Sequence, residues 1–147
     1  KQMLAHDFPF DAVLMPLNAL DYHFASFERE ILPICLERGI AVLGMKSFAD
    51  GSLFESGAGI SPAEALRYSM SLPIATLVSG MDSLEVLHQN LAVAQNFQPL
   101  TDEERTAILA KTALPAANGA FELFKTARKF EANEGRVAHN YPLQPAP

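Results

Sequence analysis

Cysteine is almost absent from this sequence of 147 residues, in which Cys35 is the only one. A lone cysteine cannot form an intrachain disulfide, so nothing marks the chain as a secreted, cross-linked protein. The neighbours of Cys35 in segment 32–36 are apolar. This setting favours a buried, inert thiol over a nucleophile.

Long apolar runs are also lacking. None approaches the roughly 20 residues that a membrane-spanning helix needs, and no signal peptide is visible. We therefore expect a cytoplasmic protein without a membrane partner. The sequence begins at Lys1 rather than at a methionine, which leaves open a preceding segment and any targeting signal on it.

An excess of positive charge is absent, because the formal net charge is −6 and the pI is about 5.1. Such a chain matches a phosphate backbone poorly, so nucleic acid is excluded as the expected partner. Metal-ligand spacing is missing too: the histidines form neither HxH nor HExxH. A metal-dependent barrel hydrolase is therefore a weak alternative, which tightly bound zinc would revive. We expect no metal site.

Three short apolar runs are present, at residues 12–15, 40–43 and 74–78, each bounded by Gly or Pro. Continuous apolarity is typical of parallel strands that are covered on both faces. Helical patterns follow each run, at residues 26–38, 61–72 and from 82 onward. Ser61 and Glu64 predict a capping box for the second helix, and the third should bury an apolar face that includes Leu84 and Leu91.

The order strand, helix, strand, helix, strand, helix predicts an α/β fold of about three parallel βα units. Three units cannot close an eight-stranded barrel, which typically needs about 250 residues. A further capping box at Thr101 and Glu104 predicts a helix to about residue 113, and a second helical run follows Asn118. Charged residues 125–129 are most simply a solvated helix face. The Pro-rich residues 141–147 should be disordered or lie on the surface.

In parallel α/β folds the functional groups lie in the loops after the strands, which here are segments 16–22, 44–57 and 79–83. Lys46 directly follows a strand beside Gly44 and could hold a phosphate with nearby backbone N–H groups, although a solvent-facing lysine is the simpler alternative. Segment 79–83 runs straight into a helix N-terminus, which favours an anion. Asp82 and Ser83 are equally good helix caps.

These segments together resemble the aldo/keto reductase family. Residues 72–91 are similar to the family's last strand and helix, with Gly80 and Asn90 at the family's separation. Residues 38–47 resemble its seventh strand, residues 10–18 its sixth, and residues 97–104 the segment after the last barrel helix. The resemblance implies that residues 1–112 are the C-terminal half of a (β/α)8 TIM barrel. Residues 113–147 would be a helical extension and tail that looks specific to a bacterial subgroup.

The resemblance also implies a site for NADP or NAD. Met45 takes the place of an aromatic ring against the nicotinamide, and Lys46 and Ser47 fall where the family meets the pyrophosphate. The remaining positions fall on the adenosine side: Gly80, Met81, Asp82, Ser83, Gln89 and Asn90. Asp82 stands where NADPH-preferring members often carry a basic residue, so it argues against a strong NADP preference.

The family's catalytic Asp, Tyr, Lys and His lie in the first half of its barrel, so no catalytic residue is carried over to this chain. The leading hypothesis is part of an NAD(P)H-dependent oxidoreductase acting on a carbonyl/alcohol pair, inactive without the N-terminal half of the barrel. The alternative is a non-catalytic half-barrel that self-associates to cover its sheet edges.

Overall fold

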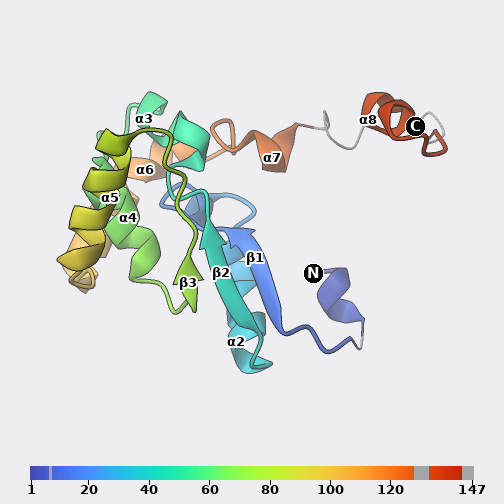
Figure 1. Ribbon diagram of the computed structural model, residues 1–147, viewed down its shortest axis with the longest axis horizontal. Helices are drawn as coiled ribbons and strands as arrows, with labels where there is room; N and C mark the ends of the chain where they lie inside the picture. The colour runs from blue at the N-terminus through green and yellow to red at the C-terminus, as the bar shows by residue number, and fades with distance from the viewer. Residues whose placement is uncertain (7, 128–132, 144–147) are drawn as a thin grey trace.

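The computed structural model describes residues 1–6, 8–127 and 133–143, and its centre is a parallel sheet of three strands. The strands are β1 (Ala12–Pro16), β2 (Ala41–Met45) and β3 (Thr76–Leu77), in the order β1-β2-β3 (Figure 1). Leu14 lies opposite Leu43, which lies opposite Thr76. The apolar runs thus form parallel strands as predicted, although β3 is shorter than the run at 74–78.

Helices connect the strands and continue after β3. They are η1 (Met3–Ala5), η2 (Asp21–His23), α1 (Phe27–Glu30), α2 (Leu32–Glu37), η3 (Ala49–Gly51), α3 (Ser52–Glu55), α4 (Pro62–Met70), α5 (Leu84–Gln95), α6 (Asp102–Ala116), α7 (Leu123–Thr126) and α8 (Asn133–Ala138). The single helix predicted at 26–38 is wrong, because the chain breaks at Ile31. Pro33 explains the break: its ring would clash with the carbonyl of Arg29 in a continuous helix.

The predicted caps are confirmed. The Ser61 hydroxyl accepts from the Glu64 N–H at 3.2 Å while the Glu64 carboxylate accepts from the Ser61 N–H at 2.8 Å. Thr101 and Glu104 form the same reciprocal pair at the start of α6. The last predicted helix is shorter than expected, since α7 ends at Thr126, and residues 128–132 and 144–147 of the predicted helix and tail lie outside the described residues.

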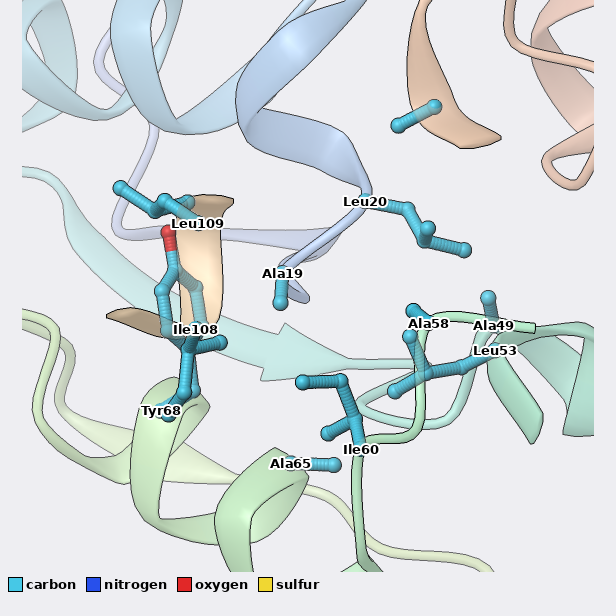
Figure 2. Close-up of a cluster of buried hydrophobic side chains, with 11 residues drawn as sticks. Ala19, Leu20, Ala49, Leu53, Ala58, Ile60, Ala65, Tyr68, Ile108 and Leu109 are labelled. Atoms are coloured by element: carbon cyan, nitrogen blue, oxygen red, sulfur yellow. The ribbon is translucent and has the colours of Figure 1, made fainter. Parts of the chain in front are cut away.

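Two apolar cores hold the fold together. The first packs α2 against one face of the sheet, and it buries Cys35 completely beside Met15 and Val42. Burial raises the pKa of the Cys35 thiol, as expected for the inert residue that the sequence predicted. The second core lies at the carboxyl ends of the strands and joins the loops to α3, α4 and α6 (Figure 2). It therefore fixes the loops in which function is expected.

The opposite face of the sheet is open. Leu14 is 50% exposed on this face and Val78 is 51% exposed, whereas Val42 on the covered face is only 2% exposed. In the part of the chain that the structure describes, no further strand pairs with the outer edges of β1 and β3. The prediction that the helix from residue 82 onward buries an apolar face is also wrong, because Leu84 and Leu91 of α5 are 73% and 44% exposed. The sheet and α5 thus leave apolar surface without a partner.

We expect Leu53→Ala to lower the free energy of unfolding by about 3 kcal/mol, because Leu53 is fully buried in the second core and truncation leaves a cavity. Leu114→Ala is the matched control on a side chain that is 87% exposed, and it should change stability by no more than about 0.5 kcal/mol. Urea unfolding followed by circular dichroism measures both. Equal effects of the two substitutions would contradict the placement of this core.

Candidate functional site

A hollow of about 760 Å³ lies at the carboxyl edge of the sheet, between the loops after β2 and β3. Parallel strands place these loops side by side, which is why segments 30 or so residues apart meet here. The hollow is lined by most of the residues that the sequence singled out: Met45, Lys46, Ser47, Gly80, Met81, Asp82 and Gln89. Phe48, Asp50 and Phe54 also line it, and the two phenylalanine rings lie 5.2 Å apart.

Ser83 and Asn90 lie beside the hollow instead of lining it. The Ser83 hydroxyl caps α5 by accepting from the Val86 N–H at 3.2 Å. Asn90 is buried and donates to the Ser79 hydroxyl at 3.0 Å, which ties α5 to the end of β3. Both side chains therefore stabilise α5 and its connection to β3, and their contact with a nucleotide remains a prediction.

Lys46 occupies a strained turn at the mouth of the hollow. Its φ of 56° is in the left-handed region, and Ala49 and Asp50 follow with φ of 49° and 58°. Such conformations cost of the order of 1–3 kcal/mol each and persist only where surrounding contacts enforce them. The Lys46 ammonium forms an ion pair with Asp50 and lies 5.5 Å from the centre of the Phe124 ring. The cation thus already has partners within the chain.

Asn18, at the end of β1, holds the backbone of this turn. Its side-chain N–H donates to the Lys46 carbonyl and to Glu122, both at 3.2 Å. Its side-chain oxygen accepts from the N–H groups of Leu20 and Asp21. Asn18 is fully buried, so the loop after β1 supports the loop after β2. The sequence placed segment 16–22 among the functional loops but gave no signal for this residue.

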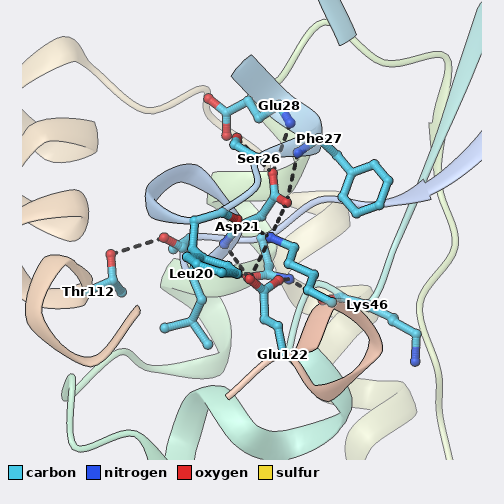
Figure 3. Close-up of polar contacts among 12 residues, drawn as sticks. Leu20, Asp21, Ser26, Phe27, Glu28, Lys46, Thr112 and Glu122 are labelled. Atoms are coloured by element: carbon cyan, nitrogen blue, oxygen red, sulfur yellow. Dashed lines mark hydrogen bonds and ion pairs between the residues drawn. The ribbon is translucent and has the colours of Figure 1, made fainter. Parts of the chain in front are cut away.

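Asn18 contacts a buried ionic cluster through Glu122. Figure 3 shows two carboxylates of this cluster, Asp21 and Glu122. The Lys125 ammonium contacts carboxylates of Asp21 and Glu122 at 2.7 Å each and the Phe24 carbonyl at 2.8 Å. The Lys125 side chain is only 4% exposed, so the prediction that it lies on a solvated helix face is wrong. Arg128 and Lys129 of the same predicted face lie outside the described residues. Burial raises the pKa of Glu122, and Lys125 opposes that rise.

The buried carboxylate of Glu28 in α1 joins this helix to α4 and α6. Glu28 accepts from the Tyr68 hydroxyl at 2.7 Å and from Arg105 at 2.5 Å. Burial raises the pKa of Glu28, and burial together with Glu28 raises the pKa of Tyr68. His23 bonds with Thr112 at 3.0 Å, and burial lowers its pKa. These acid–base groups serve the core, and none of them lines the hollow.

The titratable side chains that line the hollow are those of Lys46, Asp50 and Asp82 within the described ranges. The arrangement offers one cation, two carboxylates, an exposed aromatic ring at Phe54 and the start of α5. Among the described residues that line the hollow there is no tyrosine or histidine that could pass a proton to a ligand.

Comparison with solved structures identifies the fold. The chain is similar to the aldo-keto reductase AKR11C1 from Bacillus halodurans, in its holo form with a TM-score of 0.60 and in its apo form with 0.59. Sequence identity is 20% in both cases, and the match covers 82% of this chain. The α/β fold with its parallel sheet is therefore an aldo-keto reductase-like fold, in agreement with the sequence resemblance.

The chain spans about half the length of these structures, 48% of the holo form and 49% of the apo form. No protein-family model matches the chain, and no curated protein matches it. None of the helices in residues 1–6, 8–127 and 133–143 has the length and apolarity required to cross a membrane.

We expect Lys125→Met to lower the free energy of unfolding by about 3–5 kcal/mol at pH 7, because it leaves Asp21 and Glu122 buried without their cation. The loss should shrink as the pH is lowered, since protonation removes the unpaired negative charge.

The matched control is Lys111→Met, which removes a surface pair with Glu64 whose side chains are 43% and 33% exposed. It should cost at most about 1 kcal/mol. Denaturant unfolding between pH 4.5 and 7 measures both variants, and equal small losses would mean that Lys125 is solvated.

Proposed function

We propose that the chain is the C-terminal part of a (β/α)8 barrel and supplies the cofactor-binding loops of an NAD(P)H-dependent aldo/keto reductase. The observation that carries this proposal is the hollow at the carboxyl edge of the sheet. Its lining joins Lys46 and Ser47 after one strand to Gly80, Met81 and Asp82 after the next. The aldo-keto reductase-like fold supports the same assignment.

The groups in the hollow fit a nicotinamide dinucleotide. Its volume of about 760 Å³ lies within the usual range for cofactor pockets. Lys46 and the N-terminal turn of α5 would hold the pyrophosphate, because a cation and a positive helix end both favour an anion. Met45 offers apolar contact to the nicotinamide, although it lacks the stacking of an aromatic ring.

To bind the pyrophosphate, the Lys46 ammonium must exchange its present ion-pair partner for the ligand. The ammonium is paired with Asp50, whose side chain is 64% exposed. An exposed ion pair is worth little, so a doubly charged pyrophosphate can replace the carboxylate at small cost. The strained turn already aims the lysine at the hollow, and the ordering of its backbone is complete before the ligand arrives.

The bound nucleotide would supply the hydride for a carbonyl substrate. This chain would hold the nucleotide, whereas the group that passes the proton would come from the other half of the barrel. That half would also cover the open face of the sheet at Leu14 and Val78. A non-catalytic half-barrel is the second candidate. It is favoured by the same open face and by the outer edges of β1 and β3, which no strand of the described residues pairs and which a second copy could cover.

We expect NADH and NADPH, titrated separately by calorimetry, to bind the chain saturably. Lys46→Ala should weaken both by about tenfold or more, because it removes the cation from the pyrophosphate position. Lys111→Ala on α6 is the matched control and should leave both affinities unchanged. Absence of saturable binding would contradict the proposed function and would favour the non-catalytic half-barrel, for which a symmetric dimer with strands paired across its interface is the expected finding.

Asp82 should set the choice of nucleotide. It lines the hollow, and a carboxylate repels a ribose 2′-phosphate but accepts from a ribose hydroxyl. We therefore expect the chain to prefer NADH, and Asp82→Ser to tighten NADPH about tenfold relative to NADH. Asp102→Ser at the start of α6 is the control, and an unchanged ratio in Asp82→Ser would place the 2′-hydroxyl elsewhere.

A further inference from the structure

The one-turn helix α7 and its N-cap residue Glu122 lie close to Lys46, although the two segments are far apart in the sequence. The Phe124 ring lies 5.5 Å from the Lys46 ammonium. The Glu122 carboxylate accepts from the same Asn18 side-chain nitrogen that donates to the Lys46 carbonyl. The Lys46 side chain therefore contacts the C-terminal segment directly, whereas the Lys46 carbonyl is linked to it through Asn18.

The link from Glu122 to Lys46 is constrained because Glu122 and Asn18 are both buried and hydrogen-bonded. Asn18 is fully buried, and Glu122 is 1% exposed. Lys125 fixes the second oxygen of Glu122 at 2.7 Å and is itself held by Asp21. A buried, fully satisfied polar network of this kind specifies one geometry, since each alternative leaves an unpaired group.

The position of the chain just before α7 is also specific, because Gly119 packs closely against Phe24. Gly119 has φ of 71°, and a Cβ atom there would lie 2.5 Å from the Phe24 ring. The chain just before α7 thus approaches the loop after β1 more closely than any other residue type permits. Figure 3 shows Glu122 beneath Asp21 and the Lys46 side chain extending away from the cluster.

Resting on the proposed function, we infer that Glu122, which precedes α7, and Phe124 of α7 are positioning residues for the nucleotide site. Through Asn18, Glu122 holds the Lys46 carbonyl and so enforces the left-handed turn. Phe124 holds the ammonium at the edge of the hollow while allowing it to leave Asp50 for a phosphate. The C-terminal segment would thereby set how well Lys46 meets the pyrophosphate without touching the nucleotide through Glu122.

Two variants of one residue test the hydrogen-bonded link. Glu122→Ala removes the acceptor from Asn18, whereas Glu122→Gln keeps a side-chain oxygen for it. We expect Glu122→Ala to weaken NADH binding about tenfold and Glu122→Gln to change it by less than about twofold, as measured by calorimetry on the full chain. Glu37→Ala, an exposed residue of α2, is the control for loss of a carboxylate.

The amide signals of residues 47–51 in a ¹H–¹⁵N correlation spectrum provide a readout without nucleotide. Glu122→Ala should shift them while the signals of α5 stay in place, and Glu122→Gln should restore them. Phe124→Leu is the second variant, which keeps apolar bulk and the ion pairs of Lys125, although it also removes the ring that lies 5.9 Å from the Lys125 ammonium. We expect Phe124→Leu to weaken NADH binding about threefold, because it removes one partly exposed cation–π contact with Lys46.

The outcomes separate this inference from the function on which it rests. If the unaltered chain binds NADH but Glu122→Ala binds equally well with unmoved signals for residues 47–51, the positioning role is overturned and the proposed function stands. Weakened binding in Glu122→Gln equal to that in Glu122→Ala overturns it too, because then the charge matters and not the bond to Asn18. If the unaltered chain binds neither nucleotide, both proposals are overturned.

Discussion

The ammonium of Lys125 is the group on which the loop architecture depends. It lies between two buried carboxylates, Asp21 and Glu122, and removing it would leave both without their cation. Burial raises the pKa of Glu122, and the Lys125 ammonium opposes that rise. Asp21 in turn accepts from the N–H groups of Phe27 and Glu28 and so starts α1. One cation therefore couples the C-terminal segment to the loop after β1.

That coupling extends to the candidate site because parallel strands end at one edge. Asn18 follows β1 and Lys46 follows β2, so a single side-chain amide spans the two loops at 3.2 Å. The strain at Lys46 persists because the Asn18 contact and the second core both oppose its relaxation. The hollow is thus shaped by groups that lie behind it as much as by those that line it.

The covered and open faces of the sheet differ for a physical reason. Helix α2 follows β1 by a crossover and buries Val42 and Met15, whereas the side chains of Leu14 and Val78 point to the other face and stay exposed. In the structures that share this fold the chain matches about half of their length. We propose that the open face belongs to the barrel interior, which would place the hollow at the barrel mouth.

The sequence by itself determined what local rules control. Continuous apolar runs specified parallel strands, Ser61 with Glu64 specified the start of α4, and the loops after β2 and β3, which the sequence singled out, line one hollow. Local rules failed where partners are distant. Lys125 looked solvated because its carboxylate partner Asp21 lies 104 positions away, and Leu84 looked buried because its periodicity does not reveal whether a neighbour exists. Only the tertiary structure decided that Lys125 is buried and Leu84 exposed, since burial is a property of the packed chain and not of the segment.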